Sequence, residues 1–129
     1  MDLDNKVSLV TGAGQGIGEG IAKNLASKGS KVIVVDLNQR SSENVAEEIN
    51  AKFPNSAFSF QADLTNSDEI ESMLEFGIVK FNKIDCICNN AASSKGFGPV
   101  ENYSLEDVQA TLDLTFTSLC KCLQAEISF

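Results

Sequence analysis

The stretch TGAGQGIGEG, residues 11–20, places five glycines in ten residues directly after the apolar run KVSLV. Glycine is costly to order, so this density predicts a backbone that turns sharply or approaches a ligand closely. Ile17, Ile21 and Leu25 repeat at helical spacing, which predicts a helix immediately after the glycines. A glycine loop between a strand and a helix N-terminus can hold nucleotide phosphates. A turn with only a structural role is the alternative.

The spacing of the glycines distinguishes between types of phosphate loop. Thr11 is followed by Gly12, Gly16 and Gly18, whereas G-x-G-x-x-G counted from Gly12 would need glycine at Ile17. The loop is not of the Walker A type, because no Gly-Lys-Ser/Thr follows it. We expect the loop to contact a dinucleotide through Gly12, Gly14, Gln15, Gly16, Ile17 and Gly18.

The remaining pattern alternates strands with helices. KVIVVD, residues 31–36, has four consecutive β-branched residues, which is typical of a strand buried on both faces of a parallel sheet. Further strands are expected over residues 57–63, at a sheet edge, and 83–90, with helices around Val45 and from Ser67 and Ser104. The chain is therefore expected to be one α/β dinucleotide-binding domain, residues 1–129, with a Rossmann-type doubly wound parallel sheet in strand order 3-2-1-4.

The last helix is expected to begin at a capping box formed by Ser104 and Asp107. Its apolar stripe comprises Leu105, Val108, Leu112, Phe116, Leu119 and Leu123. Apolar residues also lie off this stripe, namely Leu114, Cys120 and Ile127. We expect the domain to be truncated after this helix, so that the off-stripe surface and the open edge of the fourth strand are bare and available for self-association or pairing with another subunit.

Composition excludes several classes of function. The net charge of −8 argues against binding nucleic acid or an anionic membrane surface. The polar N-terminus MDLDNK and the lack of a long apolar run favour a cytoplasmic protein with reduced cysteines. Without histidine there is no Ser-His or Cys-His pair and no histidine metal ligand. A zinc site at Cys86, Cys88, Cys120 and Cys122 is a minor alternative to the expectation of no metal.

Asp36 ends the second strand, 18 residues beyond Gly18. A carboxylate in this place can accept hydrogen bonds from the adenosine ribose and would repel a 2′-phosphate, so NAD is the expected cofactor. Neither Gln15 nor Leu37 offers a cation to a 2′-phosphate, but the nearby Arg40 keeps NADP as a less favoured option. The alternative for Asp36 is a helix cap or a solvated strand end.

Four landmarks occur in a fixed order: TGAGQGIG (11–18), Asp36 after VIVV, ADLT (62–65) and NNAA (89–92). On these motifs the chain resembles the N-terminal half of the short-chain dehydrogenase/reductase family. The resemblance implies that the glycines and the Ile17 N–H bind pyrophosphate and that Asp36 binds the adenosine ribose. It further assigns the adenine amino group to Asp63, packing near the ring to Leu64, and the floor beneath the cofactor to Asn89, Asn90 and Ala91, with Ala92 in place of the usual glycine. Alternatively, Asn89 ties neighbouring strands together and Asp63 is a turn or cap residue.

The catalytic groups of the family are not assigned to this chain. The family's serine and Tyr-x-x-x-Lys pair are absent, and Tyr103 is followed four residues later by Asp107. Thr115 aligns with an asparagine that positions the catalytic lysine through water; the alternative is an ordinary polar helix residue. The resemblance therefore implies the cofactor-binding portion of an NAD(P)-dependent oxidoreductase for alcohol/ketone hydride transfer, inactive as this chain alone. A catalytically dead NAD-binding or interaction module is the other hypothesis.

Overall fold

The computed structural model describes residues 2–93 and 98–129. Strands and helices alternate as predicted, and the elements are β1 (Val7–Thr11), α1 (Gly16–Ser27), β2 (Lys31–Asp36), α2 (Gln39–Lys52), β3 (Ala57–Gln61), α3 (Ser67–Phe81), β4 (Cys86–Cys88), η1 (Val100–Asn102), α4 (Leu105–Leu112), η2 (Asp113–Thr117) and α5 (Ser118–Ser128). The predicted loop between the fourth strand and the last helix includes residues 94–97, which lie outside the described residues.

The four strands form one parallel sheet in the order β3-β2-β1-β4, which confirms the predicted topology. β2 is central, and its residues 32–35 are fully buried, as the β-branched run indicates. β3 lies at a sheet edge, as expected. The fourth strand is shorter than the predicted 83–90, because only Cys86–Cys88 pair with β1.

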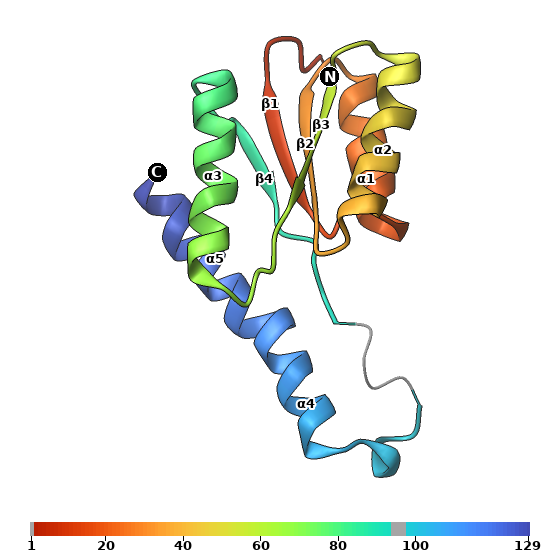
Figure 1. The fold of residues 1–129 in the computed structure, drawn as a ribbon, viewed down its shortest axis with the longest axis vertical. Helices are drawn as coiled ribbons and strands as arrows, with labels where there is room; N and C mark the ends of the chain where they lie inside the picture. Colours follow the sequence, from red (N-terminus) through yellow and green to blue (C-terminus); the bar gives the residue numbers. More distant parts are fainter. Residues whose placement is uncertain (1, 94–97) are drawn as a thin grey trace.

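Helices cover both faces of the sheet. In Figure 1, α1 and α2 lie on one side, and α3 and α5 on the other. Alternate residues of β1 and β2 point to opposite faces, so Leu9 and Ile33 pack in one core, whereas Val10 and Val34 pack in the other. Each such large buried side chain stabilises the fold by about 1.5–3 kcal/mol. The two cores hold the strand ends, and the loops that follow them, in fixed positions.

The last helical segment buries a different face from the predicted one. Its predicted stripe is exposed, with Leu105 88% and Phe116 64% accessible. Leu114, expected to be bare, instead packs with the buried Cys122 against the core; Ile127 is exposed, as expected. The physical reason is η2, a π-helical turn in which the Ser118 N–H donates to the Asp113 carbonyl. This wider turn rotates the face of α5 relative to α4, and α4 projects beyond the sheet (Figure 1).

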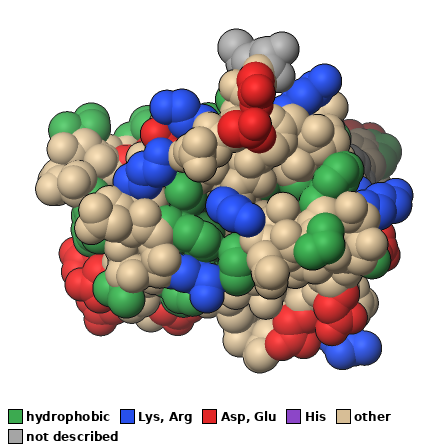
Figure 2. All heavy atoms as spheres, turned by 90° about the horizontal axis from the view of Figure 1, so that it is seen from above, with side chains coloured by type: hydrophobic (Ala, Val, Ile, Leu, Met, Phe, Trp, Pro, Cys, Tyr) green, Lys and Arg blue, Asp and Glu red, His purple; other side chains and the backbone are tan. Residues whose placement is uncertain are grey.

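The amino ends of the strands are held by ion pairs. Asp85 accepts from the Lys6 ammonium at 3.3 Å, the Lys83 ammonium at 2.9 Å and the Val7 N–H at 2.9 Å. The hydrogen bond from Lys83, followed by that from the Val7 backbone, lowers the pKa of Asp85 to about 2. Figure 2 shows this end of the molecule, where basic side chains stand apart from one another among acidic, polar and hydrophobic ones. The glycine loop lies at the opposite end of the sheet.

Candidate functional site

Three glycines of the loop meet specific steric needs. Gly12 and Gly16 have φ values of +61° and +60°, in the left-handed region that favours glycine. A Cβ on Gly18 would lie 2.2 Å from the Gly12 carbonyl oxygen and 2.5 Å from the Asn90 amide nitrogen. The pattern TGxxxGxG is therefore the one that this strand-to-helix turn requires.

The loop leads directly into the N-terminus of α1. Gln15 is the N-cap residue, and its side chain makes no capping hydrogen bond to the first turn. The first N–H groups of a helix lack partners within it and favour an anion, so this end can receive a phosphate. The Ile17 side chain is 79% exposed and so does not pack in the core. The role of its backbone N–H as a phosphate donor stays a prediction.

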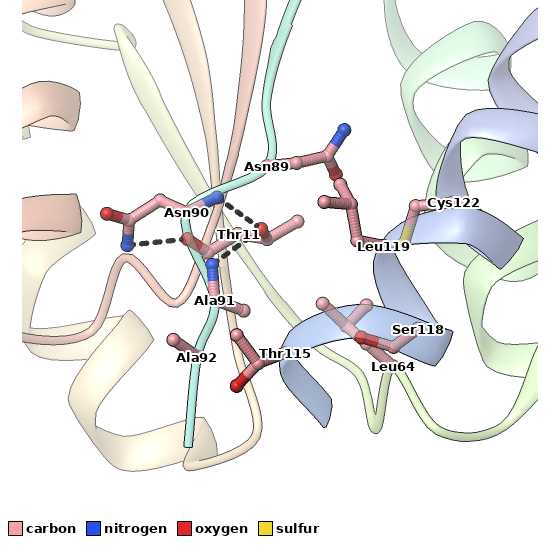
Figure 3. Close-up of a pocket in the computed structure, with 10 residues that line it drawn as sticks. All are labelled: Thr11, Leu64, Asn89, Asn90, Ala91, Ala92, Thr115, Ser118, Leu119 and Cys122. Atoms are coloured by element: carbon pink, nitrogen blue, oxygen red, sulfur yellow. Dashed lines mark hydrogen bonds between the residues drawn. The ribbon is translucent and has the colours of Figure 1, made fainter. Parts of the chain in front are cut away.

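Thr11 joins the loop to the segment after β4. Its hydroxyl oxygen accepts from the N–H groups of Asn90 at 3.0 Å and Ala91 at 3.2 Å (Figure 3). The Asn90 side-chain amide donates in return to the carbonyls of Thr11 at 3.1 Å and Gly12 at 3.2 Å. Thr11 is 1% exposed. Sequence reasoning missed this role, although a threonine at the end of a buried strand, directly before a glycine loop, was the available signal.

Asn89 points away from the neighbouring strand. Its side-chain amide donates to a Glu126 carboxylate oxygen in α5 at 2.9 Å, and its Oδ1 atom is buried without a hydrogen-bond partner among the described residues. The hypothesis that Asn89 ties strands together is therefore wrong, and Asn90 makes that link. Figure 3 shows the two side chains diverging from the same segment.

Asp36 stands beside the glycine loop. One carboxylate oxygen accepts from the Gly14 N–H at 2.8 Å and the other accepts from the Asn38 N–H at 2.9 Å. Each oxygen of an ionised carboxylate has further acceptor capacity, which leaves room for ribose hydroxyls. Asn38, and not Asp36, caps α2, by accepting from the Ser41 N–H at 3.1 Å. The neighbouring Leu37 side chain is 61% exposed.

Asp63 and Leu64 follow β3, at the same end of the sheet as Asp36. The Asp63 carboxylate accepts from the N–H of Thr65 at 2.9 Å and from its hydroxyl at 2.7 Å, which is the geometry of a turn aspartate. Leu64 is only 6% exposed and packs in the core, so little of its side chain is free to meet an adenine ring. The assignment of Asp63 to the adenine amino group stays a prediction.

A pocket of about 240 Å³ opens between the segment after β4 and the last helix. It is lined by Thr11, Leu64, Asn89, Asn90, Ala91, Ala92, Thr115, Ser118, Leu119 and Cys122 (Figure 3). Thr115 lies in the π-helical turn, a feature common at functional sites, and its hydroxyl accepts from the Ser93 N–H at 3.2 Å. Burial, and then the charge of Glu126, raises the pKa of Cys122 to about 11, which makes this thiol unreactive.

The structure thus brings the glycine loop, Asp36 and Asn90 together at the carboxyl ends of the strands. Ala92 and Thr115 line the adjoining pocket. Tyr103 follows η1 and is not part of the lining of that pocket. Within residues 2–93 and 98–129, no group of three or more His, Cys, Asp or Glu side chains is placed to hold a metal ion. No helix in this part of the chain combines the length and apolar character needed to cross a bilayer.

Comparison with known proteins identifies relatives along the whole chain. A family model described as short chain dehydrogenase matches residues 6–128. The 7alpha-hydroxysteroid dehydrogenase of Escherichia coli (strain K12) is 38% identical over 97 residues, which cover 75% of this chain and 36% of that protein.

Solved structures agree with this match. A hydroxysteroid dehydrogenase from Escherichia coli superposes with a TM-score of 0.85 at 32% identity, covering 96% of this chain and 52% of the other. A 3-ketoacyl-(acyl-carrier-protein) reductase from Brucella melitensis, complexed with NADH, gives a TM-score of 0.87 at 31% identity, covering 95% and 49%. The chain spans about half the length, or less, of the curated relatives it matches.

Proposed function

This chain belongs to the short chain dehydrogenase family, and we propose that its residues 1–129 form the NAD-binding domain of an oxidoreductase for alcohol/ketone hydride transfer. The observation that carries the preference for NAD is the Asp36 carboxylate, held beside the glycine loop by the N–H groups of Gly14 and Asn38. An acceptor with a negative charge suits ribose hydroxyls and disfavours a 2′-phosphate.

In this proposal the chain's residues bind and orient the cofactor. Gly12, Gly16 and Gly18 let the pyrophosphate approach the backbone and the N-terminus of α1, where Ile17 supplies an N–H. Asp36 accepts from the adenosine ribose, while Asn90 and Ala91, fixed by Thr11, form the floor beneath the cofactor. The bound nicotinamide supplies the hydride chemistry.

We propose that the proton donor for the reaction is not among residues 1–129. Reduction of a carbonyl requires a proton donor beside the hydride acceptor, and Tyr103 lies outside the pocket near the cofactor site. Thr115 offers that pocket a hydroxyl, which already accepts from the Ser93 N–H. We therefore expect this chain to bind NAD without oxidising alcohols by itself.

Calorimetric titration with NAD and NADP tests the proposal. We expect NAD to bind at least about tenfold more tightly than NADP, because a charge-assisted hydrogen bond contributes about 1.5–3 kcal/mol. Asp36→Ala should reduce this preference, whereas Asp85→Asn, which removes a negative charge at the opposite end of the sheet, should preserve it. Absence of binding to both dinucleotides, or tighter binding of NADP, would contradict the proposal.

A second candidate function is that of an interaction module that pairs with another copy of this chain. The exposed stripe of α4 and α5 favours it, since Leu105, Leu112, Phe116 and Leu123 are 88%, 49%, 64% and 45% accessible. Among the described strands, β4 has a neighbour only on its β1 side, so its outer edge would add backbone groups that can pair with another chain.

We also propose a cytoplasmic location. A reducing compartment would keep the cysteines as thiols, and the described residues place no disulfide between them. Fractionation of the source cells with an antibody to this chain would test the location, and recovery from a secreted fraction would contradict it.

A further inference from the structure

Glycine is needed at position 14 for a different reason than at positions 12, 16 and 18. Gly12 and Gly16 have positive φ values, and Gly18 lies against the Gly12 carbonyl, but Gly14 is not among the residues with positive φ. A Cβ on Gly14 would instead lie 2.7 Å from the Ser41 Cβ, 2.8 Å from the Asp36 Oδ2 and 2.9 Å from the Asp36 Cγ. The absent side chain therefore makes space for Asp36 and for the first turn of α2.

The same residue also binds the carboxylate. The Gly14 N–H donates to the Asp36 Oδ2 at 2.8 Å, and the Asn38 N–H donates to the Oδ1 at 2.9 Å. Asn38 is itself fixed, because its side chain accepts from the Ser41 N–H at 3.1 Å. The carboxylate is thus held from both sides. Its residue ends β2, close to where β1 ends and α1 and α2 begin (Figure 1).

We propose that Gly14 is a positioning residue for cofactor choice, which acts through Asp36 and not through the pyrophosphate. This inference rests on the proposed dinucleotide-binding function. Gly14 holds the Asp36 carboxylate in place. In the proposed function, that carboxylate accepts hydrogen bonds from the ribose of NAD and repels the 2′-phosphate of NADP. The lack of a side chain on Gly14 and its N–H group serve the same end.

The two possible roles of Gly14 give different binding patterns. NAD and NADP share the pyrophosphate, so a loop-only role would make Gly14→Ala weaken both to the same extent. If Gly14 acts through Asp36, the added methyl group displaces the carboxylate, so NAD loses its acceptor and NADP loses part of the repulsion. The ratio of the two dissociation constants then changes.

Calorimetric titration of four chains separates these roles: the unaltered chain, Gly14→Ala, Asp36→Ala and the double variant. We expect Gly14→Ala to reduce the preference for NAD about tenfold, and to change it no further once Asp36 is alanine. Gly20→Ala is the matched control, because a Cβ there meets no atom of the described residues within 4 Å; it should leave the preference unchanged. An equal loss of both affinities in Gly14→Ala, or the same change in the Asp36→Ala background, would overturn the inference.

Hydrogen exchange of the Gly14 amide, measured by NMR, tests the contact even if Gly14→Ala does not fold. We expect exchange to be about tenfold faster in Asp36→Ala than in the unaltered chain, because the acceptor is removed. Unchanged protection would overturn the inference. Failure of the unaltered chain to bind either dinucleotide would overturn the proposed function and this inference together, whereas binding with an unaltered preference in Gly14→Ala would overturn this inference alone.

Discussion

At the scale of single residues, Thr11 shows how one buried hydroxyl can join two loops. It accepts from two consecutive N–H groups, those of Asn90 and Ala91, which follow a different strand. Without the Thr11 hydroxyl, both N–H groups would have to bond to water instead. A small polar side chain at a strand end thus couples the stability of the sheet to the shape of the proposed cofactor site.

Thr11→Val keeps the shape of the side chain and removes the acceptor. We expect it to lower the free energy of unfolding by about 1–3 kcal/mol, since buried donors are left unsatisfied. Thr11→Ser retains the hydroxyl and is the control, with a smaller loss. Urea unfolding followed by circular dichroism measures both, and equal effects of valine and serine would contradict this role.

Asp85 makes the stability depend on acidic pH. Its pKa is lowered from 3.8 to about 2, so the ionised form is favoured in the folded chain. The contribution is therefore complete above pH 3.8 and is lost as the pH falls through about 2. We expect Asp85→Asn to unfold at a lower urea concentration than the unaltered chain at pH 7, and the difference to shrink between these two values. A difference that is unchanged at pH 2 would contradict the assignment.

At the scale of elements, two of the three glycines in α1, Gly18 and Gly20, have opposite surroundings. A Cβ at Gly18 would meet the Gly12 carbonyl oxygen at 2.2 Å, whereas one at Gly20 would meet nothing within 4 Å in the part of the chain that the structure describes. We expect Gly18→Ala to destabilise the fold by about 1–3 kcal/mol and to impair NAD binding, because the backbone must shift. Gly20→Ala should stabilise the helix by up to about 1 kcal/mol. Thermal unfolding of both variants tests this contrast, and equal effects would refute it.

The segment from α4 to α5 tests the second candidate function. We expect Leu112→Glu with Phe116→Glu to abolish self-association, because the exposed stripe would become charged, and to change the unfolding free energy by no more than about 0.5 kcal/mol. Val79→Glu in α3, where the side chain is 87% exposed, is the matched control. Sedimentation velocity over a range of concentrations measures the association. A pair of substitutions that leaves association intact would exclude this stripe as the interface.

Most of the element order could be predicted because strand and helix periodicities are local. The burial of β2 follows from four β-branched residues, and the strand order follows from the Rossmann-type pattern of repeated βα units. The buried face of α5 could not be predicted, since a single π-helical turn rotates it and has no sequence signal of its own. The roles of Thr11 and Asn90 depend on contacts across 79 positions, which periodicity does not report.

At the scale of the whole molecule, the two ends of the sheet have different roles: one carries stabilising ion pairs and the other the proposed cofactor site. The amino ends of its strands carry the Asp85 ion pairs, while the carboxyl ends carry the glycine loop, Asp36 and Asn90. In parallel α/β sheets, ligands bind beyond the carboxyl ends, where neighbouring connections diverge to opposite faces. Here that divergence lies between β1 and β4, which are joined by Thr11 and Asn90.

The measurement that tests the central claim most directly is an NMR titration of the isotopically labelled chain with NAD. We predict that the largest changes in amide chemical shift fall on residues 12–18, Asp36 with its neighbour Leu37, and residues 90–92. The exposed stripe of α4 and α5 should stay unchanged at constant protein concentration. No change on addition of NAD, or changes confined to α4 and α5, would contradict the assignment of this edge of the sheet as a dinucleotide site.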